Sequence, residues 1–313
     1  MRIIRNLLIL CAATALILSS NSPAGAQSRV SIGVTETIET NNPYGDSVSL
    51  LYGIYSEITG PFCTYNYAKG DFEGRLAEKW KTENPTTWIF TLSKNYKFND
   101  GSTVTADDVV HSIMNRVIGD SQSKQKASVA PSVTKAEAVD KFTVKITTDK
   151  PTAPLLSFLC DRLIATSKAA FDKYGRDVAD KEHMMGGGPY RLKELIPGQR
   201  LVLQKRPDHP DAKKNPRAPD EVVYRIMREP EQRVTALLND EIQIAQFVPP
   251  HMRQRVEKSK NLKITPVDSV ETMFLAMQPK PPFDKKEVRQ AVCHAINRDQ
   301  IIKTLLEGSA SRL

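Results

Sequence analysis

The sequence has no apolar run that could cross a bilayer. Spanning about 30 Å of hydrocarbon takes about 20 apolar residues, and the longest run, residues 7–18, has twelve. We therefore expect neither a membrane-spanning helix nor an uncleaved membrane anchor. The short run instead has the length of the apolar region of a secretory signal.

Cysteine is also scarce, because only Cys63, Cys160 and Cys293 follow the first 26 residues. An odd number at wide spacing, with no C-x-x-C pair, excludes a disulfide framework. An oxidising compartment would permit one bridge. The pattern by itself favours buried thiols.

Sequence motifs of the common enzyme classes are missing. There is no G-x-S-x-G, H-E-x-x-H, Walker loop or dinucleotide fingerprint. The glycines at 186–188 lack the G-K-[ST] ending of a phosphate loop and predict a turn before Pro189. Asp107 and Asp108 are sequence neighbours that point to different helix faces, so we interpret them as part of a helix cap that begins at Thr105. No catalytic residue is predicted.

The sequence also lacks the patterns typical of metal sites and of nucleic-acid interfaces. The five histidines are far apart, and none has a second ligand-type residue four positions along a helix. We predict no metal and no cofactor. The net charge is +8 and falls to +6 without Arg2 and Arg5, but lysines and arginines are scattered among 36 acids. A solvated basic surface explains this better than a nucleic-acid interface.

The first 27 residues are the most informative segment present. Arg2 and Arg5 precede the apolar run, and Ala24-Gly25-Ala26 precedes Gln27, which together are typical of a cleaved signal peptide. Cys11 lies inside the apolar run after Leu10, so a lipid-modified cysteine at the cleavage point is not expected. We predict a soluble periplasmic product that begins at Gln27.

We expect a bacterial host with its export machinery to remove residues 1–26. Intact mass spectrometry of the exported protein tests this. A mature species that retains Met1, or one that carries a lipid, would overturn the periplasmic assignment.

Periodicity predicts mixed helices and strands without internal repeats. Strands are expected at residues 29–34, 88–92, 142–147, 190–192, 201–203, 222–227, 242–247, 262–267 and 272–277. Helices are expected around Leu51 to Ile58, at 106–117, from Pro230, along Val288 to Ile296 and from Asp299. Pro197-Gly198 predicts a hairpin turn.

Four sequence blocks carry a family resemblance. They are R-L-A-E-K-W at 75–80, W-I-F-T-L at 88–92 continuing into Y-K-F-N-D-G-S-T-V-T-A-D-D-V at 96–109, G-P-Y at 188–190 followed by Pro197-Gly198 and 201–205, and P-F at 282–283 followed by V-R-Q-A at 288–291 and A-I-N-R at 295–298. In this order they resemble the family 5 extracytoplasmic solute-binding proteins of ABC importers. Gly187, Ser93 and Asn297 depart from the family pattern at single positions that leave the resemblance intact.

The resemblance implies an α/β fold, namely a two-lobe periplasmic binding protein of type II with an extra subdomain in lobe I. Residues 27–58 and 186–266 would form the lobe I core, 59–185 the inserted subdomain, and 267–313 a hinge crossing and the start of lobe II. Family members are similar over roughly 500 residues, so the resemblance implies that lobe II is incomplete. We expect residues 27–313 alone to bind peptide at least a hundredfold more weakly than a completed chain, or about 2.7 kcal/mol.

The resemblance also implies partners and a site. A peptide or similar small solute and inner-membrane ABC permease subunits would be the partners, and the protein would be a monomer. The candidate ligand contacts are Tyr44, Gly45, Asp46 and Ser47 after the first strand, and Thr272, Met273 and Phe274 at the crossing, where backbone groups could pair with an extended peptide. Dipeptide, oligopeptide, opine and nickel all remain open as solutes. An exported enzyme of unrecognised mechanism and a scaffold for membrane partners are the rival classes.

Overall fold

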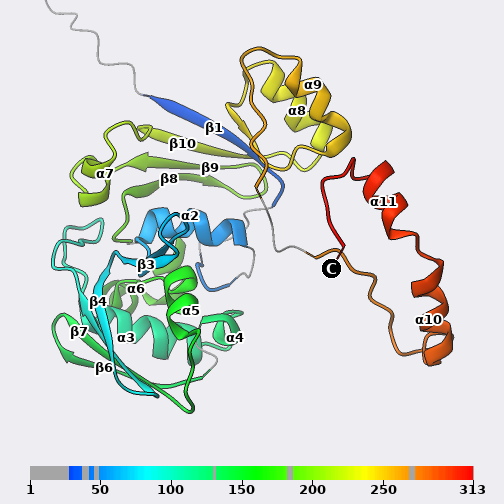
Figure 1. Cartoon of the computed structure of the whole chain (residues 1–313). Helices are drawn as coiled ribbons and strands as arrows, with labels where there is room; N and C mark the ends of the chain where they lie inside the picture. The colour runs from blue at the N-terminus through cyan, green and yellow to red at the C-terminus, as the bar shows by residue number, and fades with distance from the viewer. Residues whose placement is uncertain are drawn as a thin grey trace, which may run out of the picture. The chain divides into compact units, whose positions relative to one another are not determined.

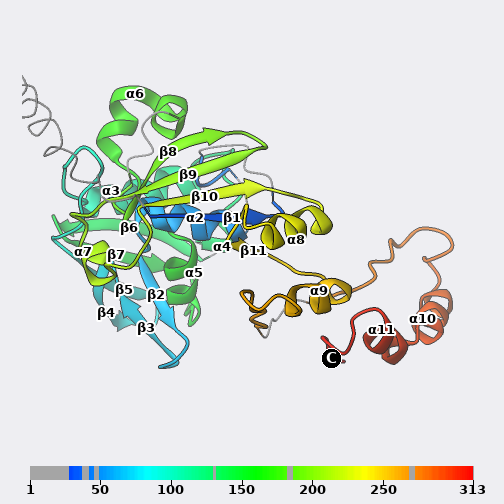
Figure 2. The ribbon, with the colours of Figure 1, turned by 90° about the horizontal axis from the view of Figure 1, so that it is seen from above.

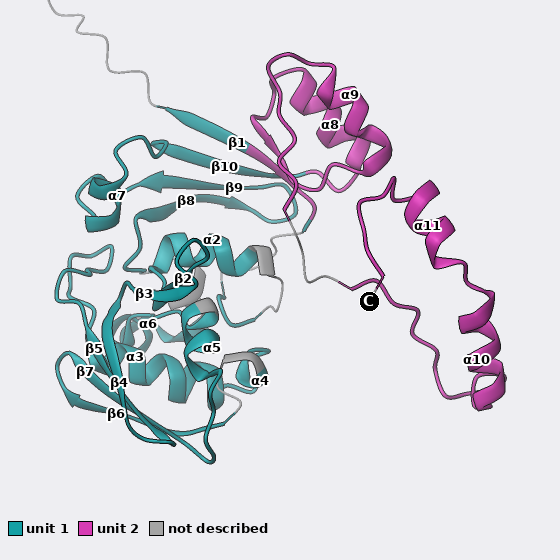
Figure 3. Ribbon diagram, viewed as in Figure 1, with its two compact units in different colours: residues 1–31, 36–226 teal, residues 32–35, 227–313 magenta. Residues whose placement is uncertain are grey.

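The computed structural model describes residues 28–36, 42–45, 49–129, 132–181, 186–267 and 272–312. The chain divides into two compact units, coloured separately in Figure 3. Unit 1 contains residues 1–31 and 36–226, and unit 2 contains residues 32–35 and 227–313. The predicted boundary between lobe I and lobe II, at Val267, differs from this boundary between the two units at residues 226 and 227. The lobe boundary stays a prediction.

The elements follow one another in mixed order (Figure 1). The strands are β1 (Arg29–Val34), β2 (Cys63–Asn66), β3 (Asp71–Gly74), β4 (Ala77–Asn84), β5 (Thr87–Leu92), β6 (Val133–Asp140), β7 (Thr143–Thr148), β8 (Tyr190–Ile196), β9 (Arg200–Lys205), β10 (Glu221–Ile226) and β11 (Ile244–Ala245). The helices are α2 (Ser49–Thr59), α3 (Ala106–His111), a π-helix (Ser112–Ile118), α4 (Lys126–Val129), α5 (Leu155–Arg162), α6 (Lys168–Lys181), α7 (Pro210–Lys214), α8 (Pro230–Leu238), a 3-10 helix (Pro250–Met252), α9 (Arg253–Glu257), α10 (Lys286–Ala295) and α11 (Arg298–Thr304).

Within the described residues, the strands form three sheets. One has the order β11-β1-β10-β9-β8, a second has the order β4-β5-β7-β6, and β2 and β3 form a hairpin. In unit 1, β8, β9 and β10 are antiparallel neighbours that run side by side (Figure 2). In unit 2, the second half of β1 pairs in parallel with β11, as Ile32 with Ile244 and Gly33 with Ala245.

The core of unit 1 confirms the apolar stripe predicted for α2. Leu51 and Ile54 are each 1% exposed and Ile58 is fully buried. Helix α2 contacts β8, and α3 covers β6 and β7 of the four-stranded sheet. Unit 2 has its own smaller core around Val234 and Ile242.

The predicted helix cap at Thr105 is confirmed. The Thr105 amide donates to the Asp108 carboxylate at 2.9 Å, which satisfies one of the amides left free at the helix start. The same carboxylate accepts the Lys168 amide at 2.9 Å. The helix covers the predicted residues, but its second half is a π-helix rather than an α-helix.

Two predicted strands are wrong. Residues 262–267 and 272–277 carry no strand in the parts that the structure describes. Alternating side chains gave the prediction, but a strand also needs a neighbour for its amides and carbonyls. Leu262 and Ile264 instead pack on the small core of unit 2. Strand β11 is also shorter than predicted, because Asp240 and Phe247 on either side adopt positive φ angles of 60° and 52°.

The preference for buried thiols is corrected as well. Cys63 and Cys160 form a disulfide across 97 positions, joining β2 to α5 inside unit 1. Cys293 is a free and exposed thiol on α10. Sequence spacing does not reveal a bridge between residues so far apart, because only the fold brings β2 and α5 together.

Candidate functional site

The loop after β1 contains a tight turn at residues 42–45. The Tyr44 amide donates to the Asn42 side-chain oxygen at 3.0 Å, and the Gly45 amide donates to the Asn42 carbonyl at 3.2 Å. Such a side-chain-to-backbone turn is typical of Asn ahead of a proline or glycine. Pro43 lies at the centre of the turn and is buried.

Tyr44 is buried in the core of unit 1, with 1% of its surface exposed. Its hydroxyl donates to the Ile164 carbonyl, and its own carbonyl accepts the Lys124 amide at 3.1 Å. Burial raises the pKa of the phenol well above its ordinary value. The side chain therefore faces the protein interior, and Gly45 beside it is half-buried. The predicted contacts Asp46 and Ser47 lie outside the described residues.

The predicted crossing lies in unit 2 and has no regular structure. Met273 is 83% exposed and Phe274 is 81% exposed, and Thr272 before them is exposed too. The fold thus joins Tyr44 and Gly45 in one turn of unit 1, whereas Thr272, Met273 and Phe274 follow one another in an irregular segment of unit 2. Their contact with a ligand stays a prediction.

The three glycines at 186–188 close the end of α2. The Gly188 amide donates to the Ile58 carbonyl at 2.9 Å and the Gly187 amide donates to the Thr59 carbonyl at 3.0 Å. Gly60 turns the helix end with a positive φ of 80°. The last carbonyls of a helix have no partner within it. The glycine segment supplies these partners, which goes beyond the turn that the sequence predicted.

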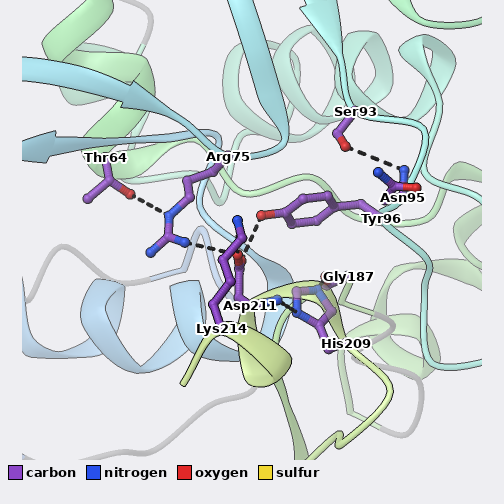
Figure 4. Close-up of polar contacts among 9 residues, drawn as sticks. All are labelled: Thr64, Arg75, Ser93, Asn95, Tyr96, Gly187, His209, Asp211 and Lys214. Atoms are coloured by element: carbon purple, nitrogen blue, oxygen red, sulfur yellow. Dashed lines mark hydrogen bonds and ion pairs between the residues drawn. The ribbon is translucent and has the colours of Figure 1, made fainter. Parts of the chain in front are cut away.

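A polar cluster that sequence reasoning missed lies beside this junction (Figure 4). The Asp211 carboxylate accepts from the Tyr96 hydroxyl at 2.8 Å and from the Arg75 guanidinium at 3.0 Å. His209 contacts the Gly187 carbonyl through Nε2 at 2.8 Å. Arg75 belongs to the R-L-A-E-K-W block and Tyr96 opens the block at 96–109, so both family blocks carried a signal for this cluster.

The Asp211 carboxylate pairs with two cations, Arg75 at 3.0 Å and Lys214 at 3.3 Å. Burial alone would raise the pKa of Asp211, but the Tyr96 hydrogen bond and the Arg75 charge outweigh it and lower that pKa below its ordinary value. Burial raises the pKa of Tyr96, and the neighbouring Asp211 raises it further. Asp211 is thus ionised and Tyr96 neutral at neutral pH. We interpret the cluster as a tie between α7 and residues 59–185 rather than as a solute site.

We expect the protein to lose stability in mild acid because of two buried histidines. Burial lowers the pKa of both His209 and His111 below the ordinary 6.5. Below that pH the unfolded chain binds protons that the folded protein does not. The free energy of unfolding should therefore fall as the pH drops from 6.5 toward the lower folded pKa, by at most about 1.4 kcal/mol per pH unit and histidine.

Urea unfolding at several pH values between 7.5 and 5 measures this slope. His209→Gln and His111→Gln should each flatten it. The control is His294→Gln, which removes a histidine that is exposed on α10 rather than buried. An equal slope in all four proteins would contradict the assignment to the buried pair.

The family model named "Bacterial extracellular solute-binding proteins, family 5 Middle" matches residues 71–313 of the chain. The chain belongs to this family. Membership confirms the resemblance seen in the four sequence blocks, and the family consists of binding proteins for transport rather than enzymes.

Curated relatives are similar along much of the chain. A probable D,D-dipeptide-binding periplasmic protein of Escherichia coli strain K12 is 29% identical over 249 residues, which are 78% of this chain and 47% of the relative. A glutathione-binding protein of Escherichia coli O6:K15:H31 is 27% identical over 308 residues, covering 96% of this chain and 57% of the relative. The chain thus spans about half the length of the curated relatives it matches.

Solved structures share the fold. The murein tripeptide binding protein of Escherichia coli matches with a TM-score of 0.80 at 21% identity, over 91% of this chain and 59% of that one. A binding protein from A. tumefacien R10, solved with mannopinic acid, matches with a TM-score of 0.73 at 26% identity, over 90% and 58%. The chain therefore has the α/β fold of periplasmic binding proteins, as expected.

No three His, Cys, Asp or Glu side chains among the described residues gather in a way that could hold a metal ion. None of the helices described has both the length and the apolar character needed to cross a bilayer.

Proposed function

We propose that this chain is part of the periplasmic substrate-binding component of an ABC importer that captures peptides and delivers them to a membrane permease. Family membership over residues 71–313 is the observation that carries the proposal. The relatives named for dipeptide and glutathione binding support a short peptide as the solute. The buried Cys63–Cys160 disulfide suits the oxidising periplasm.

Export through cleavage before Gln27 and a monomeric state belong to the same proposal. Such a protein closes on its ligand by a hinge motion between two lobes. Backbone groups at the crossing would pair with an extended peptide, which accounts for recognition of many side chains by one main-chain geometry.

We expect short peptides at millimolar concentration to raise the melting temperature of the full-length protein. The probes are glutathione, D-alanyl-D-alanine and the dipeptide Met-Leu. Binding to the folded state alone stabilises it by about 2.7 kcal/mol when the ligand is at a hundred times its Kd. Thermal-shift measurements decide the outcome, and amino-acid mixtures and simple sugars should leave the melting temperature unchanged.

The same screen tests the other solutes. A response to nickel alone, or to mannopinic acid alone, would replace the peptide by a metal or an opine-type acid. Chromatography of the incubated peptide should recover it unchanged, because turnover would indicate an enzyme. Phe274→Ala should weaken the peptide response, whereas Tyr67→Ala is the control, since it removes an aromatic side chain that is 90% exposed in the β2–β3 hairpin of unit 1 and belongs to no predicted ligand contact.

A further inference from the structure

An arginine is buried beneath the turn that follows β1. Arg116 is 1% exposed, and its guanidinium carbon lies 5.7 Å from the centre of the Tyr44 ring and 5.2 Å from that of the Phe171 ring. Cations over aromatic faces are attracted by the ring quadrupole. The cation is therefore held between a residue of the turn and a residue of α6.

The π-helix brings Arg116 to this place. Arg116 lies within Ser112–Ile118, and the Gly119 amide closes the segment by donating to the Met114 carbonyl, five positions back, at 3.0 Å. Long π-helical stretches are rare, and they widen the helix so that side chains point in other directions than in an α-helix. The Ser112 hydroxyl accepts the Thr166 amide at 2.9 Å, which fixes the start of the segment.

Three attachments join the turn to the predicted inserted subdomain, residues 59–185. Arg116 donates to the Asn42 side-chain oxygen at 3.4 Å, the same oxygen that accepts the Tyr44 amide. The Tyr44 hydroxyl donates to the Ile164 carbonyl, and the Lys124 amide donates to the Tyr44 carbonyl at 3.1 Å. The turn is thus held by residues that lie 74 to 120 positions further along the sequence.

A buried charge is a costly way to gain stability alone. Removing a guanidinium from water costs several kcal/mol, and apolar side chains of similar size often serve stability as well or better. Arginine instead offers a flat cation with donors in fixed directions, which can hold a partner in one orientation. Because Arg116 lies under the turn and donates to Asn42, it can fix the conformation of the turn.

We propose that Arg116 and Tyr44 are positioning residues, through which the inserted subdomain holds the turn Asn42–Gly45 in one conformation for solute binding. This rests on the proposed function, because the turn is a candidate ligand contact only there. It also gives Tyr44 a different role from the direct contact predicted from the sequence: its side chain anchors the turn from the protein side.

Hydrogen exchange of the protein without solute tests the anchor. Tyr44→Phe removes only the hydroxyl that bonds Ile164. Amides in peptides covering residues 42–52 and 119–126 should then exchange about tenfold faster, as expected from a lost hydrogen bond and a buried carbonyl left without its partner. Peptides from β5 and β7 should keep their wild-type rates, because the four-stranded sheet is not touched.

The matched control is Tyr190→Phe. Tyr190 is also buried, at 7% exposure, and its hydroxyl donates to the Pro219 carbonyl at 2.8 Å. The same chemical deletion there should leave exchange in residues 42–52 unchanged. Arg116→Lys should accelerate exchange like Arg116→Met, because lysine keeps the charge but not the planar stack.

Unchanged turn exchange in Tyr44→Phe and Arg116→Met would overturn the proposal. So would acceleration that spreads equally over β5 and β7, since that reports global loss of stability. The exchange experiment needs no ligand, so it separates this proposal from failure of peptide binding. If glutathione binds, Tyr44→Phe should raise its Kd about tenfold by the same conversion, and an unchanged Kd would contradict the positioning role.

Discussion

Replacing Gly188 with alanine is expected to remove about 3–5 kcal/mol of folding stability, a large part of the roughly 5–15 kcal/mol that a typical domain has. A Cβ at this position would lie 2.3 Å from the Glu57 carbonyl oxygen and 2.7 Å from the Gly60 amide nitrogen. Both are backbone atoms that cannot move aside as a side chain can. The segment would have to withdraw from α2, so the Ile58 carbonyl would also lose its amide partner.

Urea unfolding compares this variant with the control Gly53→Ala. Gly53 lies in α2, the helix that Gly188 contacts. No atom lies within 4 Å of a Cβ built at Gly53, so alanine should stabilise α2 by up to about 1 kcal/mol through its better helix propensity. Gly186→Ala should resemble Gly188→Ala, because its Cβ would meet the Ile58 carbonyl oxygen. Near-wild-type stability of both junction variants would show that the glycines are not required for this packing.

Removing the disulfide is expected to have the second large effect. The bridge between Cys63 and Cys160 spans 97 positions, and closing a loop of this size stabilises by about 4.7 kcal/mol on the chain-entropy model. The Cys63→Ala, Cys160→Ala double variant should lose several kcal/mol in denaturant unfolding. A second cause adds to this, since both side chains are buried and alanine leaves space behind.

Two measurements separate the bridge from other effects. Alkylation of the unfolded mature protein should label Cys293 alone without reductant, and all three cysteines with it. Cys293→Ser is the control and should leave the stability unchanged, because this thiol is exposed and free. Equal stability of the oxidised and reduced wild-type protein would contradict the expected contribution of the bridge.

The sequence predicted those elements whose signal is local. The stripe of Leu51, Ile54 and Ile58 predicted α2, and Pro197-Gly198 predicted the turn between β8 and β9; both are confirmed. The stripe from Val288 predicted α10, although no residue of α10 is buried. The alternation at 262–267 predicted a strand that the structure does not contain. A two-residue period describes the side chains, but it does not show whether a neighbouring strand is present to pair with.

The candidate site shows the same division at the level of single residues. Tyr44 was chosen because it follows the first strand, but its depth depends on Ile164 and Lys124 in later segments. The sequence also contains a signal at Arg116, namely a charged residue on an apolar helix face. Arg116 lies seven positions after Val109 and three after Ile113, on the apolar face of its helix, where a charged residue is unusual.

By itself, the sequence determined the class of fold, the order of most elements and the family, because helical stripes, turn residues and family blocks are patterns within a few neighbouring residues. The tertiary structure alone decided that Cys63 meets Cys160, that the glycines at 186–188 cap α2, and that Arg116 lies under Tyr44. Each of these depends on segments roughly 70 to 130 positions apart. Local periodicity carries no information about such contacts, since they form only when a common core brings the segments together.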